Sequence, residues 1–194
     1  MAKQGIRTGE FGKWLTEELA NNSQELKVYY DHGDSGTESN VKEVQAFINE
    51  AEFLTHMNRI ACIDIMMARG DEVVCLIEIE DSPDSPKGYF GDVMALLTLN
   101  RIAIKRSDGN RELFRIVPES TKAIVASHLP DKGVRLDKMI EVIAPRILQF
   151  GGLPDGIKPQ NTELIFECDI DSALRRLKTR VLEICNSVCM EETA

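Results

Sequence analysis

Apolar residues near the middle of the chain gather in two short runs that predict paired strands. The runs Arg59 to Ala68 and Glu72 to Glu80 are separated by only a few residues that include Gly70. Apolar runs of this length around a glycine-containing loop are typical of a β-hairpin. Similar patterns, bounded by turn-forming residues, predict further strands at Leu26–Tyr30, Arg101–Lys105, Glu112–Val117 and Glu163–Ile170.

Apolar positions three or four residues apart predict helices in other parts of the chain. One such stripe consists of Val41, Val44, Ile48 and Ala51, and it predicts a helix over Val41–Leu54. Pro145 is expected to kink or end one of the later helices, and Asp171 is expected to cap the last one. The remaining helices are predicted at Phe11–Asn21, Tyr89–Leu99, Thr121–Leu129, Val134–Phe150 and Ser172–Val188.

The order helix, hairpin, helix, strand predicts a layered fold of the α/β or α+β class. With 194 residues the chain suits one domain, in which residues 118–194 would form a C-terminal extension of helices and a strand. No apolar run approaches the length of a membrane span, and the first residues lack a secretory pattern. We therefore expect a cytoplasmic protein without a membrane partner.

Charge is distributed unevenly along the chain. The net charge is -9, and residues 31–81 alone hold twelve acidic and three basic residues. A negative total argues against tight non-specific binding of nucleic acid, which depends on cations that meet phosphates. Local basic faces remain possible contacts for a phosphate backbone. They are Arg175 to Arg180 on the last predicted helix and, in the stretch before it, Arg101, Lys105, Arg106, Arg111 and Arg115.

Carboxylates interrupt both strands of the central hairpin. In a regular strand Val74, Leu76, Glu78 and Glu80 would share one face, and Asp64 interrupts the preceding apolar run. An unpaired buried charge costs several kcal/mol, and neighbouring carboxylates repel one another. A hard divalent cation such as Mg²⁺ or Mn²⁺ would compensate them, because it prefers oxygen ligands.

Whether these carboxylates meet depends on the register of the hairpin. A two-residue loop, Gly70-Asp71, pairs Arg69 with Glu72 and turns Asp64 away from the glutamates. A three-residue loop would set Asp64 opposite Glu78. We predict the second register, or a β-bulge with the same effect, because a metal site requires it.

The pattern Asp64, Glu78-x-Glu80 on two strands after a helix resembles the PD-(D/E)XK phosphodiesterases, a superfamily of nucleases. The resemblance covers about residues 38–117 and implies an αβββαβ core of the restriction-endonuclease type, with a mixed sheet flanked by helices. It implies that Asp64 and Glu78 bind the metal, that Ile79 lends its backbone carbonyl, and that Glu43, or else Glu50, is an auxiliary acid.

This chain departs from the family at Glu80, which stands where the family has lysine. The resemblance implies that Glu80 acts there as an extra ligand or a base, and that Lys87 replaces the lysine from the next helix. The backbone N–H groups at the start of that helix, Gly88 to Asp92, could also bind an anion. The expected activity is metal-assisted hydrolysis of the phosphodiester bonds of nucleic acid, because the metal acidifies water and stabilises charge on phosphate.

Three alternatives remain open from the sequence. The missing lysine and the net acidity also fit a non-catalytic module that keeps a nuclease-like scaffold for protein interaction or assembly. Asp31, His32 and Asp34 could form a metal or acid/base cluster, although such loop residues usually serve turns. Apolar residues of the Val134–Phe150 helix could serve a homodimer, or they could belong to the core.

Overall fold

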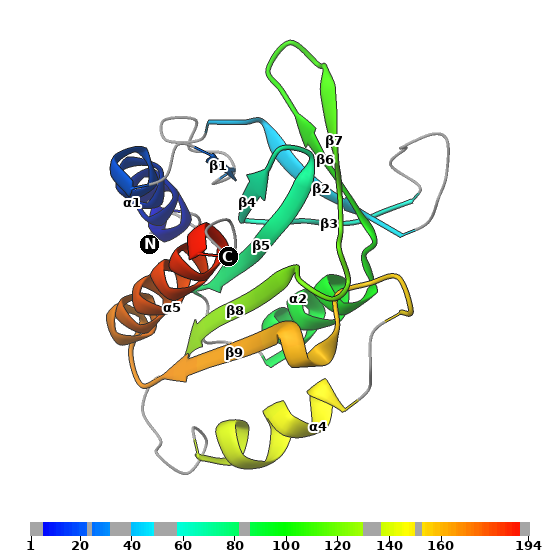
Figure 1. The fold of residues 1–194 in the computed structure, drawn as a ribbon. Coiled ribbons are helices and arrows are strands. Elements are labelled where there is room, and N and C mark those ends of the chain that lie inside the picture. Colours follow the sequence, from blue (N-terminus) through cyan, green and yellow to red (C-terminus); the bar gives the residue numbers. More distant parts are fainter. Residues whose placement is uncertain are drawn as a thin grey trace.

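The computed structural model describes residues 6–22, 25–31, 40–48, 58–81, 86–129, 137–149 and 153–190. Within these residues the protein is mixed α/β, with four α-helices packed on one mixed sheet of nine strands (Figure 1). The layered α/β class predicted from the sequence is confirmed at this level.

The sheet has two arms that share strand β5. The first arm has the order β1-β4-β5-β8-β9, and within it only β4 is antiparallel to the other strands. The second arm, β7-β6-β2-β3, is antiparallel and joins the start of β5 through the pair Glu72 and Arg115. The strands are β1 (Leu26–Tyr30), β2 (Glu43–Phe47), β3 (Arg59–Cys62), β4 (Ile65–Arg69), β5 (Glu72–Glu80), β6 (Arg101–Lys105), β7 (Arg111–Arg115), β8 (Lys122–His128) and β9 (Thr162–Glu167).

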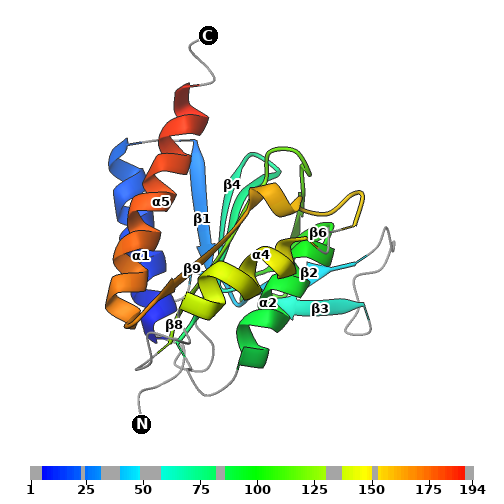
Figure 2. The same cartoon turned by 90° about the horizontal axis from the view of Figure 1, so that it is seen from below.

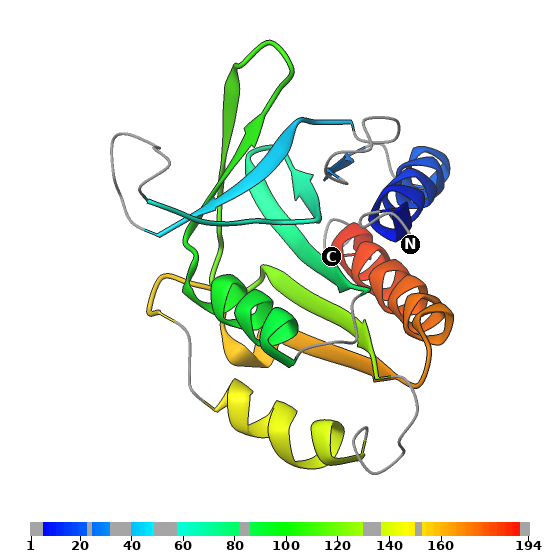
Figure 3. The same ribbon diagram turned by 180° about the vertical axis from the view of Figure 1, so that it is seen from behind.

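Helices cover both faces of the first arm. Helices α1 (Ile6–Asn22) and α5 (Ile170–Met190) lie side by side on one face, and α2 (Pro86–Thr98) and α4 (Ala144–Leu148) lie on the other (Figures 2 and 3). Helix α1 packs through Phe11, Leu15 and Leu19, which recur at every fourth residue and so share one stripe. Each face of the sheet therefore has its own apolar core.

The start of α2 follows the end of β5, and the start of α5 follows the end of β9. Because β5, β8 and β9 are parallel, these two helices begin at the same edge of the sheet. Helix α1 also begins at this edge, which is the lower end of the molecule in Figure 2. Three helix N-termini therefore meet the carboxyl ends of three strands there.

Two of the predicted helices are strands. Residues Glu43–Phe47 form β2, which pairs with β3 and β6, and Lys122–His128 form β8 between β5 and β9. Strand β8 is covered on both faces, so its apolar run is continuous, and periodicity cannot distinguish such a strand from a buried helix. The helical spacing from Val41 was coincidental, because strand pairing with both neighbours outweighs local preference.

Other elements differ in their limits. The run Arg59–Ala68 is two strands, β3 and β4, which pair with different partners. Residues within Val134–Phe150 are helical from residue 137, with a π-helical turn, η2 (Met139–Ile143), directly before α4 and its Pro145. Helix α5 is capped by Asp169 and not by Asp171, since Ser172 N–H donates to Asp169 Oδ1 at 2.8 Å.

On the helical segment with η2 and α4, Met139 and Ala144 are buried, whereas Ile140 and Val142 are exposed. The segment therefore contributes both to the core and to the surface, and a dimer through it stays a prediction. Among the described helices, none has a stretch long and apolar enough to cross a membrane.

Candidate functional site

A β-bulge in the central hairpin sets the register of the two acidic positions. The loop is Gly70-Asp71, with Gly70 at φ 58° and Arg69 opposite Glu72. Between Ala68 and Met67 the pairing shifts by one residue, so that Ile65 faces Ile77. The pairing ends at Ile65, and one residue beyond it Asp64 is joined to Glu78 and Ile79 by hydrogen bonds. The predicted bulge is therefore confirmed.

The bulge also changes the faces of the residues beside it. Val73 packs with the core under α2, whereas Val74 and Cys75 both pack toward α1 and α5. The expectation that Val74 shares a face with Leu76 is wrong, because the extra residue interrupts the alternation. Thr121, which is fully buried, donates its hydroxyl to Val73 O at 2.8 Å and so satisfies a carbonyl beside the bulge.

Reciprocal hydrogen bonds hold Asp64 and Glu78 together. The Asp64 backbone N–H donates to Glu78 Oε2 at 3.2 Å, and the Ile79 N–H donates to Asp64 Oδ2 at 2.8 Å. Glu78 is 6% exposed and Asp64 is partly buried. These hydrogen bonds form because the chain leaves the strand pairing between β3 and β4, where Asp64 lies. The Asp64 carboxylate therefore accepts from the Ile79 N–H in place of a backbone carbonyl of a neighbouring strand.

Helix α1 contributes a residue that sequence reasoning missed. The hydroxyl of Thr8, which is 3% exposed, hydrogen-bonds to the Asp64 carboxylate. Thr8 lies in the first turn of α1, far from the hairpin in sequence, so no local pattern pointed to it. The start of α1 is thereby joined to the acidic pair.

Burial and mutual repulsion raise the pKa values of the acids. Burial is the main cause that raises the pKa of Asp64 to about 7, and the charges of Asp92 and Glu80 add to it, against the hydrogen bonds from Ile79 and Thr8. Burial, followed by the charges of Asp64 and Asp92, raises the pKa of Glu78 well above its ordinary value. When no cation compensates them, both carboxyl groups therefore keep their protons to a higher pH than exposed acids do.

Asp92 on α2 joins Asp64, Glu78 and Glu80 in one acidic group. It was not identified from the sequence. Burial, and then the charge of Glu80, raises its pKa to about 6. It lies one helical turn after Gly88, on a helix that follows β5 directly. The spacing from Gly88 was visible in the sequence, but nothing local showed that this face of α2 meets the acids.

Glu80 lies against the first turns of α2. A Cβ on Gly88 would come within 2.5 Å of Glu80 Oε2, so the carboxylate occupies the space that a side chain would fill. The N-terminus of a helix favours negative charge. The anion that lies at the start of α2 in this structure is thus the chain's own Glu80.

Gly88→Ala is expected to displace the Glu80 carboxylate and to lower the pKa of Asp92 toward its ordinary value. The reason is that the Glu80 charge is the second cause of the raised pKa of Asp92, after burial. The measurement is an NMR titration of the Asp92 carboxyl carbon.

Gly91→Ala in the same helix is the matched control, because nothing lies within 4 Å of the Cβ that it adds. An Asp92 pKa that responds equally to both substitutions would contradict the proposed approach of Glu80 to Gly88.

The remaining predicted ligands are placed as follows. Ile79 lies on β5 beside the acids, and its backbone N–H is bonded to Asp64. Lys87 lies in the first turn of α2, and its side chain is outside the described part of the chain, as are Glu50, His32 and Asp34. Their predicted roles stay predictions.

Glu43 is not on a helix before the hairpin, and that expectation is wrong. It begins β2, where its carboxylate accepts from Arg59 at 2.6 Å and lies 3.2 Å from Lys105 Nζ. Hydrogen bonds from Gln45 and Lys105, with the charges of Lys105 and Arg59, outweigh burial and lower the pKa of Glu43. Glu43 thus belongs to an ion-pair cluster on the second arm of the sheet.

The basic residues predicted to contact phosphates lie on the hairpin of β6 and β7. Several of them form ion pairs with acidic residues. Lys105 pairs with Glu43, Arg106 lies 2.5 Å from Glu112, and Arg115 pairs with Glu72. All five basic residues belong to the β6–β7 hairpin, which projects from the sheet. The hairpin is a different part of the fold from β4 and β5, where Asp64 directly precedes β4 and Glu78 lies on β5.

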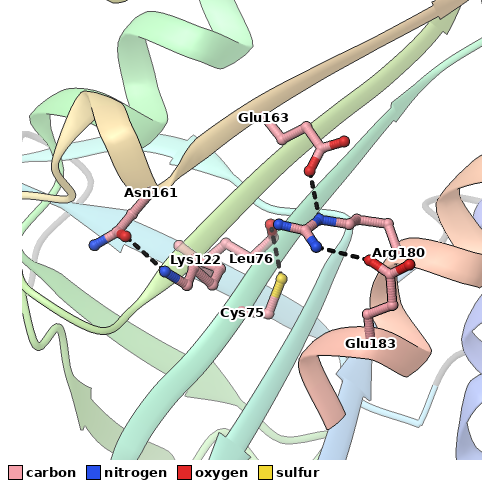
Figure 4. Close-up of polar contacts among 7 residues, drawn as sticks. All are labelled: Cys75, Leu76, Lys122, Asn161, Glu163, Arg180 and Glu183. Carbon is pink, nitrogen blue, oxygen red and sulfur yellow. Dashed lines mark hydrogen bonds and ion pairs between the residues drawn. The ribbon is translucent and has the colours of Figure 1, made fainter. Parts of the chain in front are cut away.

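The basic cluster of α5 serves partly to hold the helix on the sheet. Figure 4 shows Arg180, whose guanidinium lies 2.6 Å from Glu163 on β9 and 2.7 Å from Glu183 on its own helix. Lys178 lies over the ring of Trp14 of α1 at 4.4 Å. Cys75 lies below this ion pair in the core, and burial raises the pKa of its thiol.

The acidic group as a whole has the oxygen donors that Mg²⁺ and Mn²⁺ prefer. Across residues 6–190, apart from the stretches that are not described, no three His, Cys, Asp or Glu side chains converge as a ready metal cage. Comparison of the chain with protein-family models, with curated proteins and with solved structures finds no match.

Proposed function

We propose that this protein is a metal-dependent phosphodiesterase that hydrolyses nucleic acid, with Asp64 and Glu78 as ligands of Mg²⁺ or Mn²⁺. The observation that carries the proposal is the contact between two carboxylate residues beside the bulge: the Asp64 N–H donates to Glu78 Oε2, and the pKa values of both acids are raised. A buried pair of carboxyl groups with raised pKa values fits a hard divalent cation, which supplies the positive charge that ionised acids need.

The order of elements supports the same proposal. Helix α1, strands β1, β4 and β5, helix α2 and strand β8 follow one another as helix, three strands, helix and strand, with β2-β3 and β6-β7 inserted. With those four strands set aside as insertions, the order matches the αβββαβ order that we propose for the core. In this proposal α1 is the first helix of the core, in place of the helix that was expected at Val41–Leu54.

In this proposal the described side chains have distinct roles. Asp64 and Glu78 would hold the cation with the Ile79 carbonyl, and Thr8 orients the Asp64 carboxylate by donating its hydroxyl proton. When bound, the cation lowers the pKa of a water ligand and stabilises charge on the scissile phosphate. Glu80 would complete the metal's ligands or accept a proton, and Lys87 would offset negative charge on the phosphate.

Isothermal titration with Mn²⁺ and Mg²⁺ tests the proposal. The wild-type protein is expected to bind one of these cations saturably, and Asp64→Ala and Glu78→Gln are each expected to abolish that binding. Glu119→Gln is the matched control, because Glu119 is an exposed acid in a turn away from the pair.

A wild-type protein without saturable binding of either cation would contradict the proposal. That result would favour the other candidate, a non-catalytic scaffold. In it the carboxyl groups of Asp64 and Glu78 would stay protonated and therefore uncharged. The raised pKa values of Asp64 and Glu78 are the observation that supports this second candidate.

A further inference from the structure

The hairpin of β6 and β7 projects beyond the rest of the sheet (Figures 1 and 3). Its tip spans residues 106–110 and turns at Gly109, whose φ is 86°. At its base Ile102, Ile104 and Phe114 enter the core under α2. The opposite face of the hairpin is therefore turned away from that core.

Like charges lie directly opposite each other on this outer face. Arg101 pairs with Arg115, and Lys105 pairs with Arg111. Residues opposite each other in an antiparallel ladder share a face, and like charges in that position are destabilising. Four cations thus form two rows on one side of a two-stranded ribbon.

Acids pair with some of the cations on this face, in contacts that are partly exposed to solvent. Glu43 lies at the end of the second row, between Lys105 and Arg59. Asp71 and Glu72 lie beside Arg115, whose side chain is still 62% exposed. A polyanion that offers phosphates to both rows would compete with these acids for the same cations.

The spacing of the rows indicates which polyanion fits. Four residues of an antiparallel strand span about 13.6 Å, so the rows are about as far apart as the walls of the B-DNA major groove, which is about 12 Å wide. Between the rows lie Ala103, which is fully buried, and Leu113, which is 51% exposed.

We propose that the outer face of the β6–β7 hairpin binds duplex DNA across its major groove, with one cation row on each flanking phosphate strand. The inference names the substrate class of the proposed function. It rests on that function only in so far as the bound duplex is then hydrolysed. Single-stranded DNA offers only one phosphate strand, and the major groove of A-form RNA is too narrow for side chains to enter.

Strand β5 connects this face to the acidic group. Glu72, which pairs with Arg115 of the hairpin, and Glu78 of the acidic pair are six residues apart on the same strand. That separation is about 20 Å, or about six base pairs of duplex. This is the length by which a duplex would have to extend beyond the ribbon for the proposed function.

Fluorescence anisotropy in EDTA tests the inference with a labelled 20-base-pair DNA duplex, the same single strand and an RNA duplex, at 50 to 200 mM salt. Arg101→Gln with Arg111→Gln removes one cation from each row. The double variant is expected to raise the Kd for duplex DNA about tenfold at 50 mM salt and to reduce the slope of log K against log salt by about 2.

Arg175→Gln with Arg176→Gln on α5 makes the same change of net charge on another surface and is expected to leave binding nearly unchanged. Leu113→Glu keeps every cation but places an acid between the rows. This single substitution is also expected to weaken duplex binding relative to the wild-type protein. Both variants alter exposed positions, so each is first checked for a wild-type unfolding curve.

Equal losses from the hairpin and α5 variants would overturn the inference. So would single-stranded DNA or RNA duplex bound as tightly as duplex DNA. Because EDTA removes divalent cations, duplex binding by a protein that fails to bind Mn²⁺ would uphold this inference and overturn the proposed function alone.

Discussion

Asp64→Asn is expected to raise the free energy of unfolding of the metal-free protein at pH 8, on the order of 2 kcal/mol, and to leave it nearly unchanged at pH 4. Folding raises the pKa of Asp64 from its model-peptide value of 3.8 to about 7, chiefly by burial. Between these values the folded state binds more protons than the unfolded state. Stability therefore falls as the pH rises through this window, and the uncharged asparagine removes that fall.

Urea unfolding followed by circular dichroism in EDTA, from pH 4 to pH 8, measures this effect. Glu119→Gln is again the control, because an exposed acid should not alter the pH profile. Saturating Mn²⁺ is expected to stabilise the wild-type protein at pH 8 but not Asp64→Asn, since the cation compensates the charge that the substitution removes. An Asp64→Asn variant that is less stable than wild type at pH 8 would show that the ionised carboxylate is already well compensated within the fold.

Gly12→Ala is expected to destabilise the protein by about 3 kcal/mol. Helix α1 lies so close to β1 that a Cβ at this position would come within 2.3 Å of the Tyr30 ring. Tyr30 is buried, so its ring cannot turn into solvent, and α1 must move away from the sheet. The movement would also withdraw Thr8 from Asp64 and thereby weaken metal binding.

Gly91→Ala is the control for this substitution as well, because it adds the same methyl group to a helix at an open position. It is expected to be neutral or stabilising by up to about 1 kcal/mol, since alanine favours helix more than glycine does. Equal unfolding midpoints for the two variants in urea would refute the close approach of α1 to Tyr30.

The strands and helices with distinct local patterns were predictable from the sequence. Strands β1, β5 and β6 and helices α1, α2 and α5 lie within a few residues of the predicted limits. The errors at β2 and β8 have one cause. Both strands are buried on both faces, and their hydrogen-bond partners lie elsewhere in the chain, so local periodicity did not distinguish them from helices.

The acidic site was predictable in part. Asp64, Glu78 and Glu80 stood out because carboxylates rarely interrupt apolar strands, and the requirement for a bulge followed from the alternation of faces. Thr8 and Asp92 could not be found in this way. They reach the site from α1 and α2, whose positions depend on packing against opposite faces of the sheet.

The sequence by itself determined that two neighbouring apolar strands carry carboxylates, that most helices and strands form where they do, and that cations cluster between Arg101 and Arg115. Only the tertiary structure decided the bulge at Val74, the placement of Glu80 against Gly88, the engagement of Glu43 by Arg59 and Lys105, and the alignment of the hairpin cations in two rows. The reason is physical. Composition and periodicity report which side chains avoid water, whereas register and contact depend on which backbone groups far apart in the chain become partners.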